Sequence, residues 1–434
     1  MTAGVDLEIA SLGARGDGIA ELNGQPVFVP YALPGERVRV RLALPRRGGG
    51  RGKSSGHLRA SVTEIIEPSP DRITPACPHF GSCGGCALQH FADAPSARWK
   101  HALVVEALAR RGLPADNVRP LTAIAPGARR RADLTAIRRR NDVVLGFNAR
   151  ESHRVIDVTA CPVLKSEITR LLAPLRALLA DLLTTAERAE IVINATETGL
   201  DLLLVSDTKI EHAGYQAIAA FAETHDLARV SRQHTKSSAP ETIAQRRVPM
   251  AAFGGTPLAL PPGAFLQASA EGEASLLASV IDIAGEAKRI ADLYCGCGTF
   301  TLPLARLTRA SHPRVQGFDG NADAIAALSD AANAARLTHL SAERRDLERR
   351  PLAANELGNF DVVVFDPPRA GAKAQAKALA QSRVPKIAGI SCNPGTFARD
   401  AQILTDGGYR LDWVQPVDQF PWTPHVELAA SFSR

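Results

Sequence analysis

Four consecutive residues near the C-terminus, Ser391-Cys392-Asn393-Pro394, include the side chain best suited to covalent chemistry. They follow an apolar run, residues 386–390, that is typical of a buried strand. A thiol in this place would stand at the carboxyl edge of an α/β sheet, where open sheets of this kind bind their ligands. Because a cysteine both adds to carbon and leaves readily, Cys392 is predicted to form a temporary bond to its substrate.

An acid near the end of the chain is predicted to work with this cysteine. Glu427 opens the last apolar strand pattern, residues 426–432. A thiolate that adds to carbon 6 of a uracil makes carbon 5 nucleophilic, so that carbon 5 can accept a methyl group and must then lose its proton. We therefore interpret Cys392 as a nucleophile whose pKa is lowered by its site, and Glu427 as the base.

A glycine-rich turn after another predicted strand indicates a cofactor site. The segment 292–299 (DLYCGCGT) ends the strand pattern of residues 289–293, and its glycines allow a ligand to approach the backbone closely. It lacks the G-x-G-x-x-G form that binds a pyrophosphate, so S-adenosylmethionine is the predicted cofactor. Asp319 ends the next strand pattern and is predicted to bind ribose hydroxyls. Asp366 precedes two prolines, which would hold it rigidly over the sheet edge.

Three cysteines lie close together in CPHFGSCGGC, and a fourth stands in a later Cys-Pro turn. Cys77, Cys83 and Cys86 have the spacing C-x5-C-x2-C, and Cys161 precedes a proline. Turns rich in glycine and proline are poor places to bury apolar thiols, so the four cysteines are predicted to bind a metal. The spacing leaves two alternatives open, a tetrahedral zinc ion and an iron–sulfur cluster.

Composition indicates a globular protein of ordinary make-up. Hydrophobic residues form 45% of the chain and charged residues 22%. The first residues lack the layout of a secretory signal, and the most apolar helical stretch, residues 171–183, is too short and too interrupted to span a membrane. We therefore expect a cytoplasmic protein, in which seven cysteines favour metal binding or catalysis over disulfides.

Three predicted domains make up the chain. Residues 1–66 alternate apolar and polar residues in short strands, which predicts an oligonucleotide-binding barrel with a basic loop at residues 46–56. Residues 67–265 mix both patterns and are expected to form a central α+β domain with the metal site. Residues 266–434 predict an α/β domain, a doubly wound parallel sheet closed by an antiparallel pair. The strands expected there are 289–293, 314–318, 361–365, 386–390, 408–416 and 426–432.

Basic residues gather in two triplets, Arg129–Arg131 and Arg138–Arg140, while Lys and Arg together outnumber Asp and Glu by only 51 to 45. The triplets are predicted to contact phosphates of a nucleic acid, with a solvated charged face as the alternative. Phe265, Phe397 and Trp422 are candidates for stacking on an extruded base, with core packing as the alternative.

In the order and identity of these motifs, the chain resembles the bacterial RNA uridine-5-methyltransferases, particularly the ribosomal RNA members with an iron–sulfur site. The likeness covers almost the whole chain: an N-terminal RNA-binding TRAM barrel, the four cysteines, and the motifs DLYCGCG, DPPRAG, SCNP and FPWTPHVE. It implies a Rossmann-like class I methyltransferase domain with Cys392 as nucleophile and Glu427 as base. The implied contacts with S-adenosylmethionine are Gln267, Tyr294, Thr299, Asp319, Asp346 and Asp366. The implied ligands of a 4Fe–4S cluster are Cys77, Cys83, Cys86 and Cys161.

The resemblance also implies a product, 5-methyluridine, and the added barrel and cluster favour 23S ribosomal RNA as the substrate. Transfer RNA is the alternative substrate. An exocyclic amine methyltransferase and a non-catalytic RNA-binding or ribosome-assembly protein are the alternative functions. We expect a monomer without an obligate protein partner or membrane attachment, and a cluster that positions RNA and protein without transferring electrons.

Overall fold

The computed structural model describes residues 4–43, 58–140, 142–234, 238–307 and 312–434. The chain forms two compact units. The first unit contains Met1–Lys100, Asn148–His153 and Trp422–Pro424, and the second contains the remaining segments. The predicted basic loop at residues 46–56 lies outside the described residues, and the predicted domain limits at residues 66 and 265 stay predictions.

A six-stranded sheet fills the N-terminal part of the first unit. Its order is β1-β5-β6-β4-β3-β2, and only the β4–β6 pair is parallel among the pairs of described residues. In β5, Val38 and Val40 are fully buried while the arginines that alternate with them are exposed, so the alternation seen in the sequence builds this core. The strands are β1 (Val5–Glu8), β2 (Ser11–Leu12), β3 (Asp17–Leu22), β4 (Gln25–Pro30), β5 (Arg37–Leu42) and β6 (Leu58–Glu67).

Turns without regular structure follow the barrel and lead to helix α1 (Asp93–Ala109). This helix begins in the first unit and enters the second unit after Lys100. The cysteine-rich segment lies in these turns, so its shape depends on backbone hydrogen bonds and glycines and not on a helix or strand.

A seven-stranded sheet and two helices form the first part of the second unit. The order of the sheet is β10-β9-β8-β11-β12-β13-β14, and β12 and β13 are its parallel neighbours. Helix α2 (Ser166–Leu182) buries seven aliphatic side chains on one stripe, and α3 (His212–Thr224) packs beside it. The strands are β8 (Arg131–Arg138), β9 (Val143–Asn148), β10 (Val155–Asp157), β11 (Arg188–Thr196), β12 (Gly199–Val205), β13 (Arg229–Gln233) and β14 (Glu241–Gln245), followed by the hairpin β15 (Met250–Phe253) and β16 (Thr256–Ala259).

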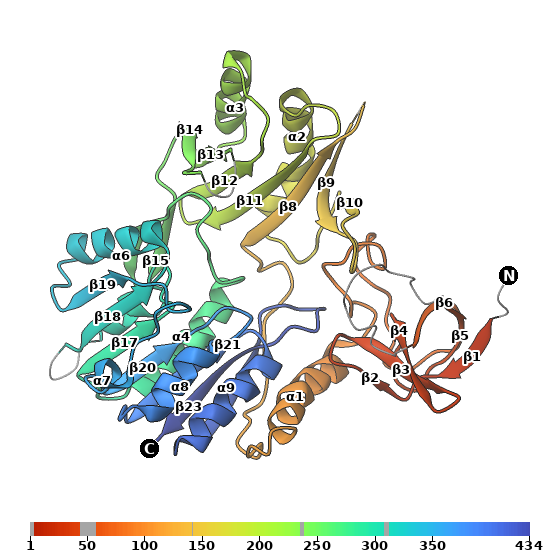
Figure 1. The fold of residues 1–434 in the computed structure, drawn as a ribbon. Helices are drawn as coiled ribbons and strands as arrows, with labels where there is room; N and C mark the ends of the chain where they lie inside the picture. The colour runs from red at the N-terminus through yellow and green to blue at the C-terminus, as the bar shows by residue number, and fades with distance from the viewer. Residues whose placement is uncertain (1–3, 44–57, 141, 235–237, 308–311) are drawn as a thin grey trace. The chain divides into compact units, whose positions relative to one another are not determined.

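An eight-stranded sheet forms the C-terminal part of the second unit, with the order β19-β18-β17-β20-β21-β23-β22-β7 (Figure 1). The run from β19 to β21 is parallel, and β23 pairs antiparallel with both β21 and β22. The predicted closing antiparallel pair is therefore confirmed. The strands are β7 (Thr122–Ala123), β17 (Arg289–Leu293), β18 (Arg314–Asp319), β19 (Leu340–Arg344), β20 (Val362–Phe365), β21 (Lys386–Ser391), β22 (Arg410–Asp418) and β23 (Glu427–Ser433).

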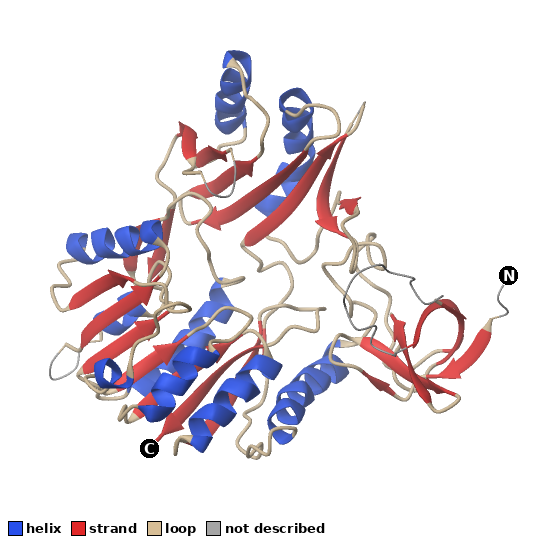
Figure 2. Ribbon diagram, in the orientation of Figure 1, coloured by secondary structure: helices blue, strands red, loops and turns tan. Residues whose placement is uncertain are grey.

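Helices cover both faces of this sheet (Figure 2). The buried side chains of α8 and α9 form one apolar cluster with the sheet, and those of α4 and α5 form another. Helix α6 packs against the β15–β16 hairpin in a third cluster. The helices are α4 (Ala270–Ala284), α5 (Thr301–Ala305), α6 (Ala322–Ala334), α7 (Ala354–Leu357), α8 (Lys373–Gln381) and α9 (Pro394–Asp406). In the described part of the chain, no helix has the length and apolarity needed to cross a membrane.

The parallel register brings the predicted chemistry to one edge. Leu293 pairs with Phe365, and Phe365 pairs with Gly389, so β17, β20 and β21 end side by side. The chain leaves β17 towards β18 on one side, while β20 lies on the other side, which makes β17 and β20 the switch point of the sheet. Ligands of doubly wound sheets bind at this point, beyond the carboxyl ends of the strands.

Candidate active site

The turn after β17 is shaped by left-handed backbone conformations. Tyr294, Gly296 and Gly298 have φ values of 64°, 54° and 94°. A side chain at Gly298 would lie 2.6 Å from Leu328 of α6, so this position requires glycine for packing as well as for conformation. The turn therefore has open backbone at its tip and a tight contact at its base, as expected of a ligand-binding turn.

Asp319 fixes this turn from the neighbouring strand. Its Oδ2 accepts the N–H of Gly296 at 2.9 Å, and its Oδ1 accepts the N–H of Asn321 at 2.8 Å. Each carboxylate oxygen keeps a second lone pair, so the carboxylate can also accept a hydroxyl. Asp319 thus lies where the sequence predicted a ribose-binding acid, and the structure adds that it holds the glycine turn in place.

Two buried polar atoms next to the turn lack a hydrogen-bond partner among the described residues. Asp292 is fully buried; Thr301 donates to its Oδ2 at 2.6 Å, but its Oδ1 has no partner. Burial raises the pKa of Asp292 to about 7, with Asp366 and Asp319 adding to the effect. The buried hydroxyl of Tyr294 is likewise unpaired, and burial raises its pKa. Unpaired buried groups of this kind fit a cofactor that carries amino and hydroxyl groups.

The other predicted cofactor contacts have different surroundings. Thr299 is partly exposed in the turn before α5. Asp346 follows β19, and its Oδ1 accepts the N–H groups of Glu348 and Arg349, both at 3.1 Å. Gln267 is buried, and its side-chain oxygen accepts a hydrogen bond from Gln419. Asp346, like Asp319, therefore lies at the carboxyl edge of the sheet.

Cys392 lies between the end of β21 and the start of α9. The side chain of Asn393 caps α9 by accepting the N–H groups of Gly395 and Thr396 at 3.0 and 3.4 Å, and Pro394 occupies the first turn. This Asn-Pro pair therefore fixes where the strand stops and leaves the thiol at the junction. The cap explains why Cys392 stands at the sheet edge and not inside the helix.

Glu427 lies opposite the cysteine. Ser391 pairs with Leu428 in the antiparallel β21–β23 ladder, so the next residues outward, Cys392 and Glu427, face each other across the two strands. Glu427 is 6% exposed, and burial raises its pKa to about 8, with the nearby carboxylate of Asp366 adding to the effect. The predicted nucleophile and base are thus neighbours.

The thiol of Cys392 does not have the lowered pKa that the sequence interpretation required. Burial raises the pKa of Cys392 to about 11, and Glu427 and Asp366 contribute to this rise, while Arg369 opposes them. The prediction that the site lowers the pKa of this thiol is therefore wrong for the protein without ligands. The pKa of Asp366, which directly follows β20, is raised to about 7 by desolvation. Burial, together with the carboxylates around the thiol, is the physical reason for the difference.

The loop of the DPPRAG motif is bound to α9. The carbonyl oxygen of Arg369 accepts a hydrogen bond from Thr396 Oγ1 at 3.2 Å, and Asp400 Oδ2 accepts the N–H of Ala372 at 3.0 Å. Arg369 Nη2 lies 3.5 Å from Nδ1 of His425. Sequence reasoning missed Arg369 as a charged group near the thiol, although its place three residues after Asp366 was a usable signal.

The cysteine-rich turn lies in the first unit. Gly84 donates its N–H to the carbonyl oxygen of Asn148 at 2.9 Å, and a side chain there would come within 2.9 Å of backbone atoms, so only glycine fits. The N–H of Gly85 lies 3.4 Å from the sulfur of Cys83, a contact that stabilises negative charge on sulfur. Thiolates with backbone N–H donors are a suitable donor set for zinc or iron.

The fourth predicted metal ligand, Cys161, belongs to the second unit, and Cys77, Cys83 and Cys86 belong to the first. All four are partly exposed. Within the described ranges, no three His, Cys, Asp or Glu side chains are grouped so as to hold a metal ion. The predicted metal site therefore stays a prediction.

The first arginine triplet has mainly structural contacts. Arg130 forms an ion pair with Glu273 at 2.5 Å, and Arg131 donates to the carbonyl oxygen of Ala264 at 2.7 Å. Both guanidinium groups are largely buried, so the prediction that they contact phosphates is not supported. In the second triplet, Arg139 and Arg140 are exposed at the β8–β9 turn, as a phosphate contact requires.

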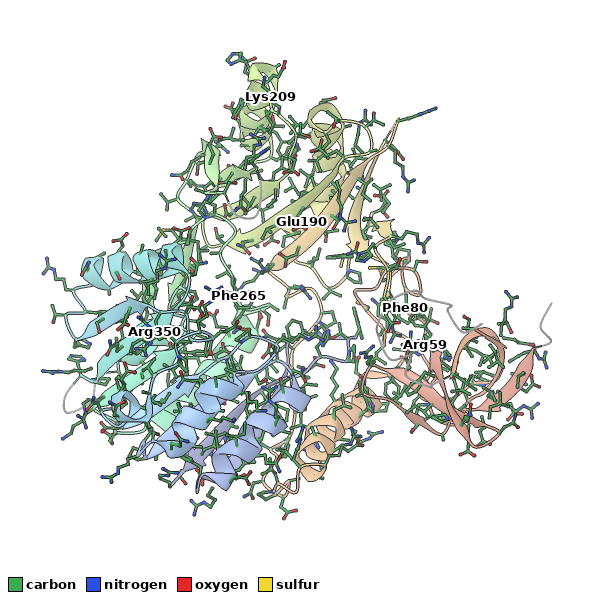
Figure 3. The ribbon with its side chains drawn as sticks, viewed as in Figure 1. Arg59, Phe80, Glu190, Lys209, Phe265 and Arg350 are labelled. Carbon is green, nitrogen blue, oxygen red and sulfur yellow. The ribbon has the colours of Figure 1, made fainter. Side chains whose placement is uncertain are left out.

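The three aromatic candidates also differ. Phe397 is 6% exposed and packs in the core between α9 and the sheet. Phe265, on the segment between β16 and α4, is 67% exposed (Figure 3). Trp422 is partly exposed with a φ of 61°, and its carbonyl oxygen accepts the N–H groups of Ala87 and Leu88, both at 2.9 Å. Phe265 is therefore the candidate whose ring is most accessible to a base.

Comparison with known proteins gives two family-model matches. The model for tRNA (Uracil-5-)-methyltransferase matches residues 259–434, and the model for the TRAM domain matches residues 4–53. An uncharacterized RNA methyltransferase of Brucella suis biovar 1 is 43% identical over 99% of this chain and 97% of its own length. The 23S rRNA (uracil(1939)-C(5))-methyltransferase RlmD of a Shewanella species is 30% identical over 100% of this chain and 96% of its own length.

Among solved structures, the Pyrococcus abyssi tRNA (uracil-54, C5)-methyltransferase in complex with S-adenosyl-L-homocysteine matches with a TM-score of 0.70. The match covers 99% of this chain and 100% of that chain at 22% identity. This likeness shows the fold, and together with the TRAM match it confirms the predicted fold class, an α/β methyltransferase domain with an N-terminal barrel.

Proposed function

The chain belongs to the S-adenosylmethionine-dependent RNA uracil-C5 methyltransferases, and we propose that it forms 5-methyluridine in 23S ribosomal RNA through a covalent bond between Cys392 and the target base. The observation that carries this proposal is the pairing of β21 with β23, which puts Cys392 opposite the buried Glu427. A nucleophile and a carboxylate across one strand pair can act on adjacent carbons of a single ring.

The cofactor is held by residues at the carboxyl edge of the sheet. In this proposal Asp319 accepts the ribose hydroxyls, and Tyr294 and Asp366 line the β17–β20 switch point. Gln267, Thr299 and Asp346 complete the site. When bound, S-adenosylmethionine would supply a methyl group on a positively charged sulfur. The raised pKa values of Asp366 and Glu427 single these carboxyl groups out as candidates for a role at this edge of the sheet.

The protein residues act in two steps. The sulfur of Cys392, on losing its proton, bonds to carbon 6 of uracil, and the electron pair of the ring double bond moves to carbon 5 and the carbonyl oxygen. After carbon 5 has received its methyl group, Glu427 removes the carbon 5 proton, the double bond re-forms and the bond between sulfur and carbon 6 breaks. Because the ring lies inside a stack in paired RNA, the base must be extruded or already unpaired.

The ribosomal substrate is supported by the relative that is 30% identical and matches along nearly the whole of both chains. Transfer RNA stays the alternative substrate. An exocyclic amine methyltransferase and a non-catalytic RNA-binding protein would have no use for a cysteine opposite a buried glutamate, so this pair of residues favours uracil C5 chemistry over both.

The four cysteines are proposed to hold a 4Fe–4S cluster, with zinc as the alternative. The supporting observation is the glycine turn whose N–H approaches the sulfur of Cys83. Metal analysis of the purified protein, iron and sulfide against zinc, together with visible absorption, distinguishes the two. No step of the methyl transfer uses this group.

Two experiments test the proposed function. RNA containing 5-fluorouridine should form a stable covalent adduct with the wild-type protein, because carbon 5 then carries fluorine and no proton can be removed. The adduct should be absent with Cys392→Ala. Mapping of 5-methyluridine in ribosomal and transfer RNA from cells with and without the gene should locate one missing site in 23S ribosomal RNA. A missing site in transfer RNA would favour the alternative substrate.

A further inference from the structure

A buried acid on α9 binds the end of the DPPRAG loop. Asp400 is 4% exposed, and its Oδ2 accepts the N–H of Ala372, the residue that follows the motif, at 3.0 Å. Its Oδ1 accepts a hydrogen bond from Nε of Arg399, the preceding residue of the helix, at 2.9 Å. One oxygen of Asp400 therefore binds the loop, and the other binds a charge partner on the same helix.

Two further side chains of α9 bind carbonyl oxygens of this loop. Thr396 Oγ1 donates to the carbonyl oxygen of Arg369 at 3.2 Å, and Arg399 Nη2 donates to that of Ala370 at 3.1 Å. Residues 396, 399 and 400 are three and four positions apart, so they share one face of the helix. Thr396, Arg399 and Asp400 are called the α9 clamp below.

The loop packs directly on the clamp at Gly371. This residue has a φ of 71°, which favours glycine, and its N–H donates to the carbonyl oxygen of Pro368 at 2.7 Å in a tight turn. A side chain at Gly371 would lie 2.5 Å from Oδ2 of Asp400 and would also collide with Nη2 of Arg399. The turn thus brings bare backbone against both charged groups of the clamp.

The clamped loop also lies against the residue that follows the thiol. The last pair of the β21–β23 ladder joins Ser391 to Leu428, so Cys392 lies one residue beyond the ladder. Nδ2 of Asn393 donates to the carbonyl oxygen of Arg369 at 3.5 Å, and this is the oxygen that the clamp also binds. The position of the thiol beyond the ladder therefore depends on the loop as well as on β21.

The side chain of Arg369 extends from the loop towards the candidate base. Its Nη2 lies 3.5 Å from Nδ1 of His425, which comes two residues before Glu427. The backbone of Arg369 is thus attached to the helix of the nucleophile, while its guanidinium group lies next to the segment that carries the base. A shift of the DPPRAG loop would change both contacts at once.

The clamp supports a stretch of chain that has no regular structure. β20 ends at Phe365, α8 begins at Lys373, and the residues between them form neither helix nor strand. The apolar contacts of α8 and α9 with the sheet come from other side chains, among them Ala376 and Phe397. Loss of the carboxylate of Asp400 should therefore free the loop without unfolding the helices.

We propose that Asp400 is a positioning residue for the reaction: through the α9 clamp it holds the DPPRAG loop in a fixed position relative to Cys392, so that the loop and the thiol meet the target base as one unit. The inference rests on the proposed function and adds a residue that does not touch the base. Without the clamp, RNA still binds, but the covalent bond between Cys392 and the base forms slowly.

The test measures how fast the covalent adduct forms in the full-length protein. Wild type and Asp400→Leu are mixed with S-adenosylmethionine and an excess of a 23S ribosomal RNA transcript made with 5-fluorouridine, and the adduct is followed over time on denaturing gels. Leucine has almost the size of aspartate but cannot accept the N–H of Ala372. We expect the rate constant of adduct formation to fall by about 10²-fold, the loss caused by a remote change that misplaces a reacting group.

Further readouts separate positioning from stability. A residue that only stabilises the fold would lower the amplitude of adduct formation, which reports the fraction of folded protein, and would leave the rate constant as in wild type. Asp400→Asn keeps an oxygen that can accept the N–H of Ala372, so its rate constant should lie between those of Asp400→Leu and wild type. Backbone hydrogen exchange in residues 366–372 should be faster in Asp400→Leu than in wild type. RNA affinity, measured by filter binding, should be unchanged in both variants.

A matched control lies at the end of the same helix. Asp406 is the last residue of α9 and is exposed. Asp406→Leu makes the same chemical change outside the clamp, so it should keep the wild-type rate constant and the wild-type exchange of the loop. Thr396→Val keeps the shape of the side chain and loses one neutral hydrogen bond of the clamp, so it should reduce the rate constant by about 2- to 10-fold.

Three results would overturn the inference alone. The first is a wild-type rate constant in Asp400→Leu with only its amplitude reduced, and the second is an equal fall of the rate constant in Asp406→Leu. The third is wild-type exchange of residues 366–372 in Asp400→Leu, which would show that the carboxylate does not hold the loop. A wild-type protein that forms no adduct would overturn the proposed function, and this inference with it.

Discussion

Two regions of the second unit bury carboxylates in opposite ways. In the central sheet, Asp201 is 1% exposed and receives two hydrogen bonds from Arg229, at 2.8 and 2.9 Å. At the edge of the C-terminal sheet, Asp292 and Glu427 are also buried but have no arginine partner among the described residues. Burial raises the pKa of Asp201 too, although Arg229 opposes this effect. Without an arginine partner, the pKa of Asp292 is raised to about 7 and that of Glu427 to about 8.

The presence or absence of an arginine partner separates buried carboxylates that serve structure from those that can serve chemistry. A buried carboxylate paired with arginine is stabilised in its charged form by that partner, and the pair holds two segments together. A buried carboxylate without such a partner is kept near its point of titration, where it can exchange a proton or meet a charged ligand. The location agrees with this division: Glu427 begins β23 and Asp292 lies one residue before the end of β17, whereas Asp201 lies in the interior of β12. Four substitutions test the comparison.

The largest effect is expected for Cys392→Ala. Without the sulfur, carbon 5 of uracil is not activated, and formation of 5-methyluridine should fall by about 10⁴-fold or more, as for other removed nucleophiles. Methyl incorporation into RNA, measured with labelled S-adenosylmethionine, checks this. The melting temperature should stay close to wild type. Methylation at a normal rate would exclude covalent catalysis at this edge.

The next effect is expected for Glu427→Gln, which keeps the shape of the side chain and removes its basicity. Proton release from carbon 5 should fall by about 10² to 10⁴-fold, the usual contribution of a general base. The covalent adduct between RNA and protein should still form and should persist with the methyl group attached. Mass spectrometry of the adduct measures both. Absence of the adduct would place the role of Glu427 in the first step.

A smaller effect, on stability alone, is expected for Asp201→Asn. The change leaves the buried guanidinium of Arg229 without its charge partner, which should reduce the free energy of unfolding by about 3 to 5 kcal/mol. Urea unfolding followed by circular dichroism measures this change. The rate of proton release from carbon 5 should depend on pH as it does in wild type. A changed pH dependence would show that the two regions are not independent.

The smallest effect is expected for Asp292→Asn. This substitution should raise the free energy of unfolding, whereas Asp201→Asn should lower it. The pKa of Asp292 is higher in the folded than in the unfolded protein, so its contribution to stability is present at low pH and is lost as pH rises towards 7. Asparagine removes this loss. The free energy of unfolding of the variant minus that of wild type should therefore increase by about 2 kcal/mol from pH 5 to pH 8. Urea unfolding at both pH values measures the gain, and an equal difference at both would contradict the raised pKa.

The sequence predicted the buried strands of the C-terminal sheet well. Strands such as β17 and β21 are covered on both faces, so they appear as continuous apolar runs. It missed β19, because this strand lies at the sheet edge and its segment LSAER is only partly buried. Side-chain pattern carries little information where one strand has solvent on its outer side.

The candidate site was predicted in its residues but not in its electrostatics. Cys392 and Glu427 were recognisable from their motifs, whereas the raised pKa of the thiol depends on burial and on carboxylates brought close by the fold. Asp400 gave no signal, because its contacts depend on how α9 lies against the DPPRAG loop and on the bare backbone at Gly371. The arginines at 129–131 look the same in sequence whether they bind phosphate or anchor a loop.

The carbonyl oxygen of Trp422 bears on how experiments on the cysteine turn should be interpreted. It is held by the two N–H groups that come directly after Cys86, in a backbone conformation that is unfavourable for a residue with a side chain. The chain reaches Glu427 only five residues later. If a Cys86→Ser protein lost activity, displacement of the segment that carries Trp422 would therefore be a sufficient explanation, and the loss would not show electron transfer.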